Sequence, residues 1–191
     1  MANKNEIREP LLRAIPSLRA FAISLCGDMD RADDLVQDTL VRALANVERF
    51  EAGTNLNAWL FTILRNLFHS EYRKRRREVE DVDGAYSDTL TSLPEQDGHL
   101  DFEDLRVALT QLPADQREAV LLVGASGFSY EEAALICDCA VGTIKSRVNR
   151  ARVRLAELMD ISDTSDLYSD QLLKSSFQTG SFANRSPIGI G

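Results

Sequence analysis

The residues best suited to a chemical task lie in segment 142–159, which reads GTIKSRVNRARVRLAELM. If this segment is helical, its apolar residues recur at spacings of three and four and form one stripe. The stripe consists of Ile144, Val148, Ala151, Leu155 and Leu158. The cations lie off the stripe, at Lys145, Arg147, Arg150, Arg152 and Arg154. The pattern therefore predicts a helix with one buried face and one cationic face.

A second, shorter helix is predicted just before this segment. Ser129 to Glu132 has the S-x-x-E form of a capping box, which starts a helix by satisfying its first backbone N–H groups. The pair has the order of a helix-turn-helix motif, whose second helix places its N-terminal residues in the major groove. Arginine and lysine pair with guanine, and asparagine pairs with adenine. The candidate base-reading residues are Thr143, Lys145, Ser146, Arg147, Asn149 and Arg150. The alternative is a solvated basic helix in an ordinary bundle.

The rest of the chain favours an all-α fold, because helix formers dominate its 191 residues and no Val/Ile-rich alternation or hairpin dipeptide occurs. The other helices are expected at 6–26, 31–47, 57–77, 102–112 and 113–125. Pro16 predicts a break near Ala14–Ile15, because proline is tolerated only in the first turn of a helix. Gly127 is expected to end the helix that Pro113 starts.

The net charge of −8 conceals a strong segregation of sign along the sequence. Residues 65–77 carry six cations against Glu71, whereas residues 78–104 carry ten acids and no Lys or Arg. The stretch after Arg77 is also rich in Asp, Gly, Ser and Pro, so we expect a flexible linker. The predicted architecture is two small helical domains joined by an acidic linker. The expected parts are 1–77, the linker 78–100, 101–160, and a disordered tail at 161–191.

Two polar stretches of the first domain are also candidate binding surfaces. Asp33, Asp34, Gln37 and Asp38 lie early in a predicted helix, where the helix dipole favours acids; a docking surface for a basic partner explains them equally well. The loop 49–57 precedes an aromatic-rich helix that ends in five cations, a combination that suits single-stranded or melted DNA.

Enzymatic chemistry is not expected from this sequence. No catalytic triad, phosphate-binding loop or cluster of metal ligands is visible, so no cofactor is expected. Cys137 and Cys139 are expected to pack as small hydrophobes, since neither His69 nor His99 is near in sequence. The three cysteines do not form a disulfide framework, and no apolar run would span a membrane. A cytoplasmic protein is expected.

Five motifs occur in order along the chain: DLVQDTLVRAL (34–44), NAWLFTILRN (57–66), LPADQREAVLLV (112–123), SYEEAA (129–134) and GTIKSRVNRAR (142–152). Together they resemble the motifs of the extracytoplasmic-function (ECF) sigma factors, and most closely those of the general-stress-response group of alphaproteobacteria. The resemblance is specific because all five occur in order at suitable separations.

The resemblance implies a non-enzymatic adaptor that recruits RNA polymerase core to stress promoters and is monomeric when free. Its helix-turn-helix would read the minus-thirty-five element as duplex, and its first domain would melt and bind the minus-ten element. The implied polymerase contacts are the β′ clamp helices and the β flap, with Asp34, Leu35, Gln37 and Asp38 on the clamp helices. The residues implied to bind the non-template strand are Asn55, Leu56, Asn57, Arg65, Asn66 and Arg73. A small anti-sigma protein is the implied inhibitor.

Two other functions remain as alternatives. A sigma-like decoy would bind the anti-sigma protein without DNA, but it would not need the cations at 73–77. A dimeric helix-turn-helix repressor would leave the first domain unexplained. The acidic linker could also screen the two basic stretches in the free protein, or it could act only as a tether.

Overall fold

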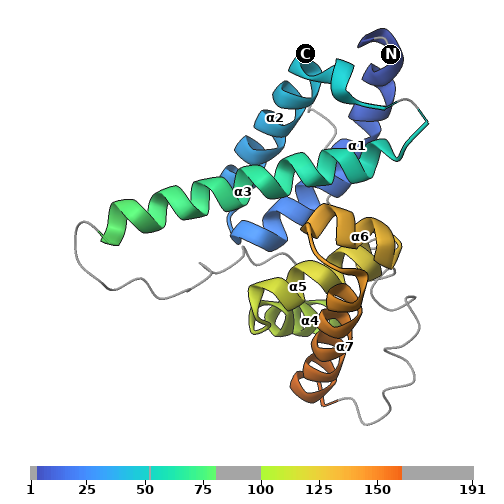
Figure 1. Ribbon diagram of the computed structural model, residues 1–191. Helices are drawn as coiled ribbons and strands as arrows, with labels where there is room; N and C mark the ends of the chain where they lie inside the picture. Colours follow the sequence, from blue (N-terminus) through green and yellow to red (C-terminus); the bar gives the residue numbers. More distant parts are fainter. Residues whose placement is uncertain (1–3, 52, 81–99, 161–191) are drawn as a thin grey trace, which may run out of the picture.

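The computed structural model describes residues 4–51, 53–80 and 100–160, and every regular element within them is helical. The first group comprises α1 (Lys4–Cys26), α2 (Met29–Ala45), the short η1 (Val47–Arg49) and α3 (Leu56–Glu80). The second comprises α4 (Leu100–Thr110), α5 (Ala114–Val120), η2 (Leu121–Ala125), α6 (Tyr130–Cys137) and α7 (Val141–Leu158). Figure 1 shows α1–α3 packed together above α4–α7, with the long α3 projecting beyond the body. The all-α prediction is confirmed.

The first group of helices is built around a shared apolar core. Gly27 takes a positive φ of 68° between α1 and α2, a conformation that glycine adopts at little cost. The Asp28 side chain then caps α2 by accepting a hydrogen bond of 2.7 Å from the Arg31 backbone N–H. The fully buried side chains of the three helices include Leu18, Leu35, Leu60, Phe61 and Leu64. This core fixes α2 and α3 side by side, with their polar faces outward.

The break expected near Pro16 was wrong, because α1 is one continuous helix with Pro10 and Pro16 inside it. Proline at position 16 removes the hydrogen bond that its N–H would donate to the carbonyl of Leu12. Leu12 and Pro16 are both exposed, so water can solvate that carbonyl. Ile7, Leu11, Ala14 and Leu18 are meanwhile buried along the opposite face, which holds the helix together.

The second group contains the predicted helix-turn-helix. The Glu132 backbone N–H donates to Ser129 Oγ at 3.1 Å, and the Ser129 N–H donates to Glu132 Oε2 at 2.9 Å, so the capping box is confirmed. Gly127 precedes it with a φ of 73°. The apolar stripe of α7 is buried at Ile144, Val148, Ala151 and Leu155. Segment 121–125 was expected as α-helix but adopts π-helical hydrogen bonds.

The two groups of helices touch each other along α3 and α6 (Figure 1). The rings of Phe61 on α3 and Phe128 before α6 meet edge to face, with centroids 4.9 Å apart. Most of the predicted linker and all of the predicted tail lie outside the described residues, although Glu78–Glu80 form the end of α3. The proposed screening by acids of the linker therefore falls largely outside the described part of the chain. Among the described helices, none combines the length and apolar character that a membrane crossing requires.

Candidate nucleic-acid and polymerase interfaces

The cationic face of α7 is presented by a tight turn after α6. Asp138 adopts the left-handed conformation with a φ of 50°, and the Cys139 N–H donates to the Ala134 carbonyl at 3.0 Å. This turn ends α6 and lets α7 start at Val141. Among the predicted base-reading residues, Lys145, Ser146, Asn149 and Arg150 are exposed. Thr143 and Arg147 are half-buried. Most of the predicted set therefore shares one accessible face early in α7.

Arg147 is held within the second group of helices. Its Nε lies 3.0 Å from Asp115 Oδ2 at the start of α5, and its Nη1 lies 3.9 Å from Cys139 Sγ. The side chain is 24 % exposed, so the guanidinium is only partly accessible. The contact joins residues far apart in sequence, and helical periodicity does not predict it. Arg147 is thus oriented by Asp115 before any DNA is present.

Asn55 lies at the start of α3 and makes two side-chain hydrogen bonds. Its Oδ1 accepts from the Ala58 N–H at 3.2 Å, which caps the helix, and its Nδ2 donates to Glu132 Oε1 at 2.6 Å. Leu56 and Asn57 were predicted as loop residues, but α3 starts at Leu56, so both lie in its first turn. Among the candidate base-capturing residues, Asn55 therefore caps α3, and Leu56 and Asn57 form part of its first turn. Asn55 and Asn57 are exposed.

The other residues predicted to line the DNA strand lie along α3 in different environments. Arg65 donates from Nε to Glu118 Oε1 on α5 at 2.7 Å, and its side chain is only 16 % exposed. Asn66 and Arg73 are exposed. The His69 imidazole Nε2 lies 3.5 Å from the same oxygen of Glu118. Glu118 and Glu132 thus contact predicted DNA-binding residues, and the sequence offered no sign of either contact.

Both glutamates are held in their charged form. Burial raises the pKa of Glu118, but the adjacent His69 and Arg65 outweigh burial, and the pKa lies below its ordinary value. The pKa of Glu132 is lowered by hydrogen bonds from the Ser129 backbone N–H and the Asn55 amide. Burial raises the pKa of the neighbouring Cys137 thiol to about 12. This protonated, buried thiol fits the packing role predicted for Cys137.

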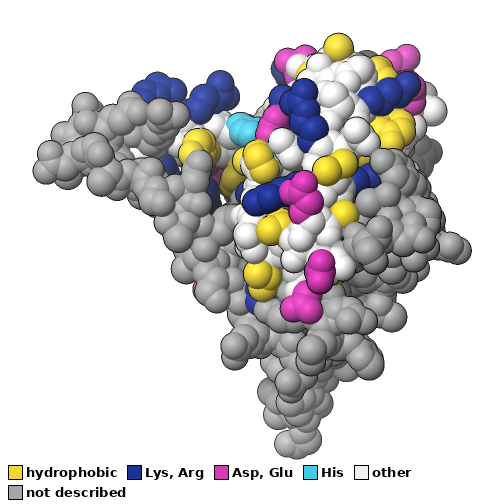
Figure 2. All heavy atoms as spheres, turned by 90° about the horizontal axis from the view of Figure 1, so that it is seen from below, with side chains coloured by type: hydrophobic (Ala, Val, Ile, Leu, Met, Phe, Trp, Pro, Cys, Tyr) yellow, Lys and Arg dark blue, Asp and Glu magenta, His cyan; other side chains and the backbone are white. Residues whose placement is uncertain are grey.

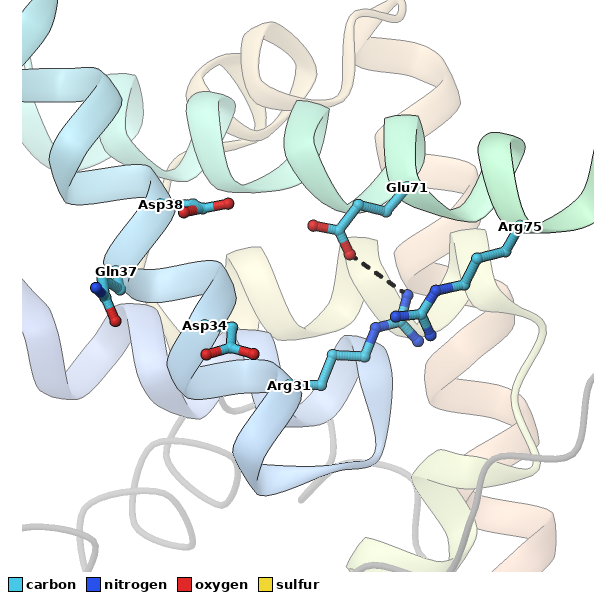
Figure 3. A pocket seen from close by; sticks show the side chains of 6 residues that line it. All are labelled: Arg31, Asp34, Gln37, Asp38, Glu71 and Arg75. Atoms are coloured by element: carbon cyan, nitrogen blue, oxygen red, sulfur yellow. Dashed lines mark ion pairs between the residues drawn. The ribbon is translucent and has the colours of Figure 1, made fainter. Parts of the chain in front are cut away.

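Three of the four predicted polymerase-binding residues lie on α2 around a polar depression of about 360 Å³. Asp34, Gln37 and Asp38 come from α2, whereas Glu71 and Arg75 come from α3; Arg31 completes the lining (Figure 3). Arg31 Nη2 lies 3.8 Å from the Glu71 carboxylate. This surface carries carboxylates of both helices beside two arginines.

The four predicted docking residues on α2 differ in how far their side chains are exposed to solvent. Asp34, Gln37 and Asp38 are exposed, whereas Leu35 is buried in the core, where it supports the helix from inside rather than offering a contact. Asp30 is the only acidic residue in the first turn of α2, where the helix dipole acts most strongly. The dipole therefore does not account for Asp34 and Asp38, which favours the docking explanation.

The basic end of α3 remains open to solvent. Arg73, Lys74, Arg75 and Arg77 are exposed. In Figure 2, which views the molecule from below, Lys and Arg side chains gather on the left, the side toward which α3 projects in Figure 1. Over the body of the molecule, basic and acidic side chains are mixed. The projecting end of α3 is therefore a cationic surface suited to phosphates.

Comparison with known families defines the class of protein. Residues 11–78 match the family Sigma-70 region 2, and residues 102–155 match Sigma-70, region 4. The first match covers α2 and most of α1 and α3, and the second covers most of α4–α7. The two groups of helices are therefore regions 2 and 4 of a sigma-70 architecture.

Individual relatives show to which group of sigma factors the chain belongs. Over 170 residues the chain is 64% identical to the ECF RNA polymerase sigma factor EcfG of Rhodopseudomonas palustris, covering 89% of this chain and 94% of the relative. It is 39% identical to the ECF RNA polymerase sigma factor SigC of Mycobacterium tuberculosis, covering 68% and 71%. The chain belongs to the ECF RNA polymerase sigma factors. This confirms the resemblance predicted from the five motifs.

A solved structure agrees with this assignment. The sigma factor RpoE of Bartonella quintana, in complex with the anti-sigma factor NepR, matches with a TM-score of 0.75 and 57% identity. The match covers 83% of this chain and 99% of that one. CnrH, solved in complex with the cytosolic domain of CnrY, matches with a TM-score of 0.61 at 26% identity.

Proposed function

We propose that this sigma factor directs RNA polymerase core to stress-response promoters and acts in the cytoplasm. Region 4 reads the upstream element as duplex, and region 2 opens and binds the downstream element. The observation that carries the proposal is the exposed polar and cationic face early in α7, set behind a capped α6 in helix-turn-helix order. The polymerase supplies all the chemistry, so the sigma factor itself is no enzyme.

Recruitment proceeds through two polymerase contacts. Asp34, Gln37 and Asp38 of region 2 bind the β′ clamp helices, and region 4 binds the β flap. The exposed acids around the α2 depression support this role, because complementary charge steers and orients a basic partner. Leu35 contributes by holding α2 in place from the core.

Promoter opening results from binding to the single strand. Asn55, Leu56 and Asn57 receive an unstacked base of the non-template strand, while Arg65, Asn66 and Arg73 contact the strand beside it. Extruding a base costs a few kcal/mol, which stacking and phosphate contacts offset, so no ATP is required. The cationic end of α3 supports this role by its exposure.

A small anti-sigma protein keeps this factor inactive in the absence of stress. The support comes from the relatives, since RpoE was solved with the anti-sigma factor NepR at 57% identity to this chain. The free factor is a monomer. Size-exclusion chromatography with a polymerase pull-down tests this against a dimeric repressor, which would elute as a dimer and leave polymerase unbound.

The direct test of the proposed function is run-off transcription with purified core polymerase on a general-stress promoter. The complete factor is expected to give a transcript that core alone does not give. An anti-sigma protein of the NepR type should abolish that transcript. Failure to stimulate core polymerase on any promoter of this class would contradict the proposed function.

Substitution of α7 residues tests upstream recognition. Arg150→Ala is expected to weaken binding of the holoenzyme to the upstream element by about 1–3 kcal/mol and to relax specificity at one base pair. Arg150 is exposed early in α7. Fluorescence anisotropy with a promoter duplex and with each single-base variant of the upstream element gives the measurement. A uniform loss over all sequences would identify a phosphate contact instead.

Asp115→Asn is the matched test for Arg147, because it removes the charge that orients the guanidinium and leaves the arginine present. Stability should fall by at most about 1 kcal/mol, because Asp115 is half exposed and surface pairs contribute little. We expect Arg147→Ala to weaken upstream binding more than Asp115→Asn does. Binding unchanged in Arg147→Ala, Arg150→Ala and Asp115→Asn would remove α7 from DNA recognition.

A further inference from the structure

Regions 2 and 4 contact each other through residues that the proposed function assigns to single-stranded DNA. Asn55 donates to Glu132 at 2.6 Å, and Arg65 donates to Glu118 at 2.7 Å. In both contacts region 2 provides the donor, and region 4 provides a carboxylate. A carboxylate satisfies an arginine or an amide in much the way that a phosphate or a base oxygen does. Region 4 thus occupies the same hydrogen-bonding groups that the strand would need.

The contact between Arg65 and Glu118 is also well protected from water. The side chain of Glu118 is 4 % exposed, and His69 contributes a second contact to its carboxylate. An ionised carboxylate is tolerated in such a place only when it is paired, and the partners on α3 provide the pairing. Because the buried rings of Phe61 and Phe128 also meet between the regions, separating the regions would expose apolar rings as well. The closed arrangement is therefore held by ionic and by apolar contacts together.

The predicted polymerase-docking surface is not involved in this closure. Asp34, Gln37 and Asp38 remain exposed on α2, around the depression in Figure 3. Polymerase can therefore reach region 2 while Arg65 is still paired with region 4. Arg75 and Arg77 are likewise exposed near the end of α3, where they can make a first, non-specific contact with DNA.

We propose that Glu118 and Glu132 of region 4 compete with single-stranded promoter DNA for Arg65 and Asn55 of region 2. The proposal rests on the strand-binding role assigned to those two residues. In the free factor, the closed form keeps the strand-binding surface occupied. Docking on polymerase and separation of the regions then precede strand capture, which confines opening to promoters that polymerase has already reached.

The test measures binding of the free, full-length factor to a fluorescent single-stranded oligodeoxynucleotide carrying the non-template downstream element of a promoter that it transcribes. Glu118→Gln and Glu132→Gln remove one charge each and keep the side-chain shape; glutamine at position 132 also retains the capping box. Apparent affinity falls with the fraction of molecules that are competent to bind, so each variant should bind the strand about tenfold more tightly. Glu131→Gln is the matched control, since Glu131 is the exposed neighbour on α6. The control should gain much less.

Small-angle X-ray scattering of the same proteins reports whether the regions separate. We expect a larger radius of gyration for Glu118→Gln than for the parent and for Glu131→Gln. A tighter strand complex with no change in size, or an equal gain in Glu131→Gln, would indicate a general charge effect and overturn the competition. Larger size without tighter strand binding would overturn it as well.

The promoter-opening activity of the holoenzyme distinguishes this inference from the proposed function. If Arg65→Ala impairs opening in the holoenzyme while Glu118→Gln leaves the free factor unchanged, the competition fails and the proposed function stands. If Arg65→Ala and Asn55→Ser both leave opening intact, the strand-binding role fails, and the competition fails with it.

Discussion

Replacing Phe61 by alanine is expected to lower the free energy of unfolding of region 2 by about 3–5 kcal/mol. Phe61 is 1% exposed, and its ring lies 5.0 Å from Phe21 on α1 and 4.9 Å from Phe128 of region 4. Truncation leaves a cavity among packed helices, because the surrounding side chains relax only partly. Urea unfolding followed by circular dichroism at the helical band measures the change.

Two further variants show which contacts of Phe61 account for the loss of stability. Phe61→Leu preserves most of the volume and should cost less than about 1.5 kcal/mol. Phe128→Ala removes a buried ring before α6 together with its contact to Phe61, so its cost should fall mainly on region 4 and leave the unfolding of region 2 nearly unchanged. A loss below about 1 kcal/mol for Phe61→Ala would mean that Phe61 is not a central part of the region 2 core.

Local patterns explain why so much of the fold follows from the sequence. The stripe of α7 repeats at helical spacing, and its members from Ile144 to Leu155 are buried, so the stripe identifies both the helix and its buried face. The Ser129–Glu132 capping box and the left-handed Gly127 determine the backbone conformation only of the few residues next to them. Because such local features do not depend on contacts with distant residues, the helix boundaries that they indicate were predicted correctly.

The errors have equally local causes. Pro16 was expected to break α1, but the residues on either side of it are anchored in the core, and packing outweighs the loss of one hydrogen bond. Segment 121–125 has nothing in its composition that separates a π-helical turn from an α-helical one.

Contacts between distant residues were beyond the reach of sequence patterns. Arg65 and Glu118 are 53 residues apart, and Asn55 and Glu132 are 77 apart. Nothing in their local sequences selects these partners, because each pairing depends on how α3 lies against α5 and α6. Individual site residues could thus be proposed from motifs. The hydrogen bonds and ion pairs that these residues make with the other region could not.

The capping bond of Asn55 changes how the role of this residue in promoter opening has to be tested. Asn55→Ala would remove the cap of α3, at a cost of about 0.5–2 kcal/mol, as well as any contact with a base. Asn55→Ser keeps a capping oxygen and removes the amide. Asn57 lies in the first turn of α3, where its replacement by alanine costs no cap. The informative variant is therefore Asn55→Ser combined with Asn57→Ala.

This double variant is expected to reduce promoter opening by the holoenzyme roughly ten- to a hundredfold, because a captured base that loses its hydrogen-bond partner costs about 1–3 kcal/mol. Permanganate footprinting of the downstream element measures the opened fraction. Polymerase binding should be unchanged, because Asp34, Gln37 and Asp38 lie on the separate surface of α2. Asp38→Lys provides the opposite control, since it should weaken the pull-down of core polymerase. Parental opening by the double variant, with polymerase bound normally, would show that the start of α3 does not hold the extruded base.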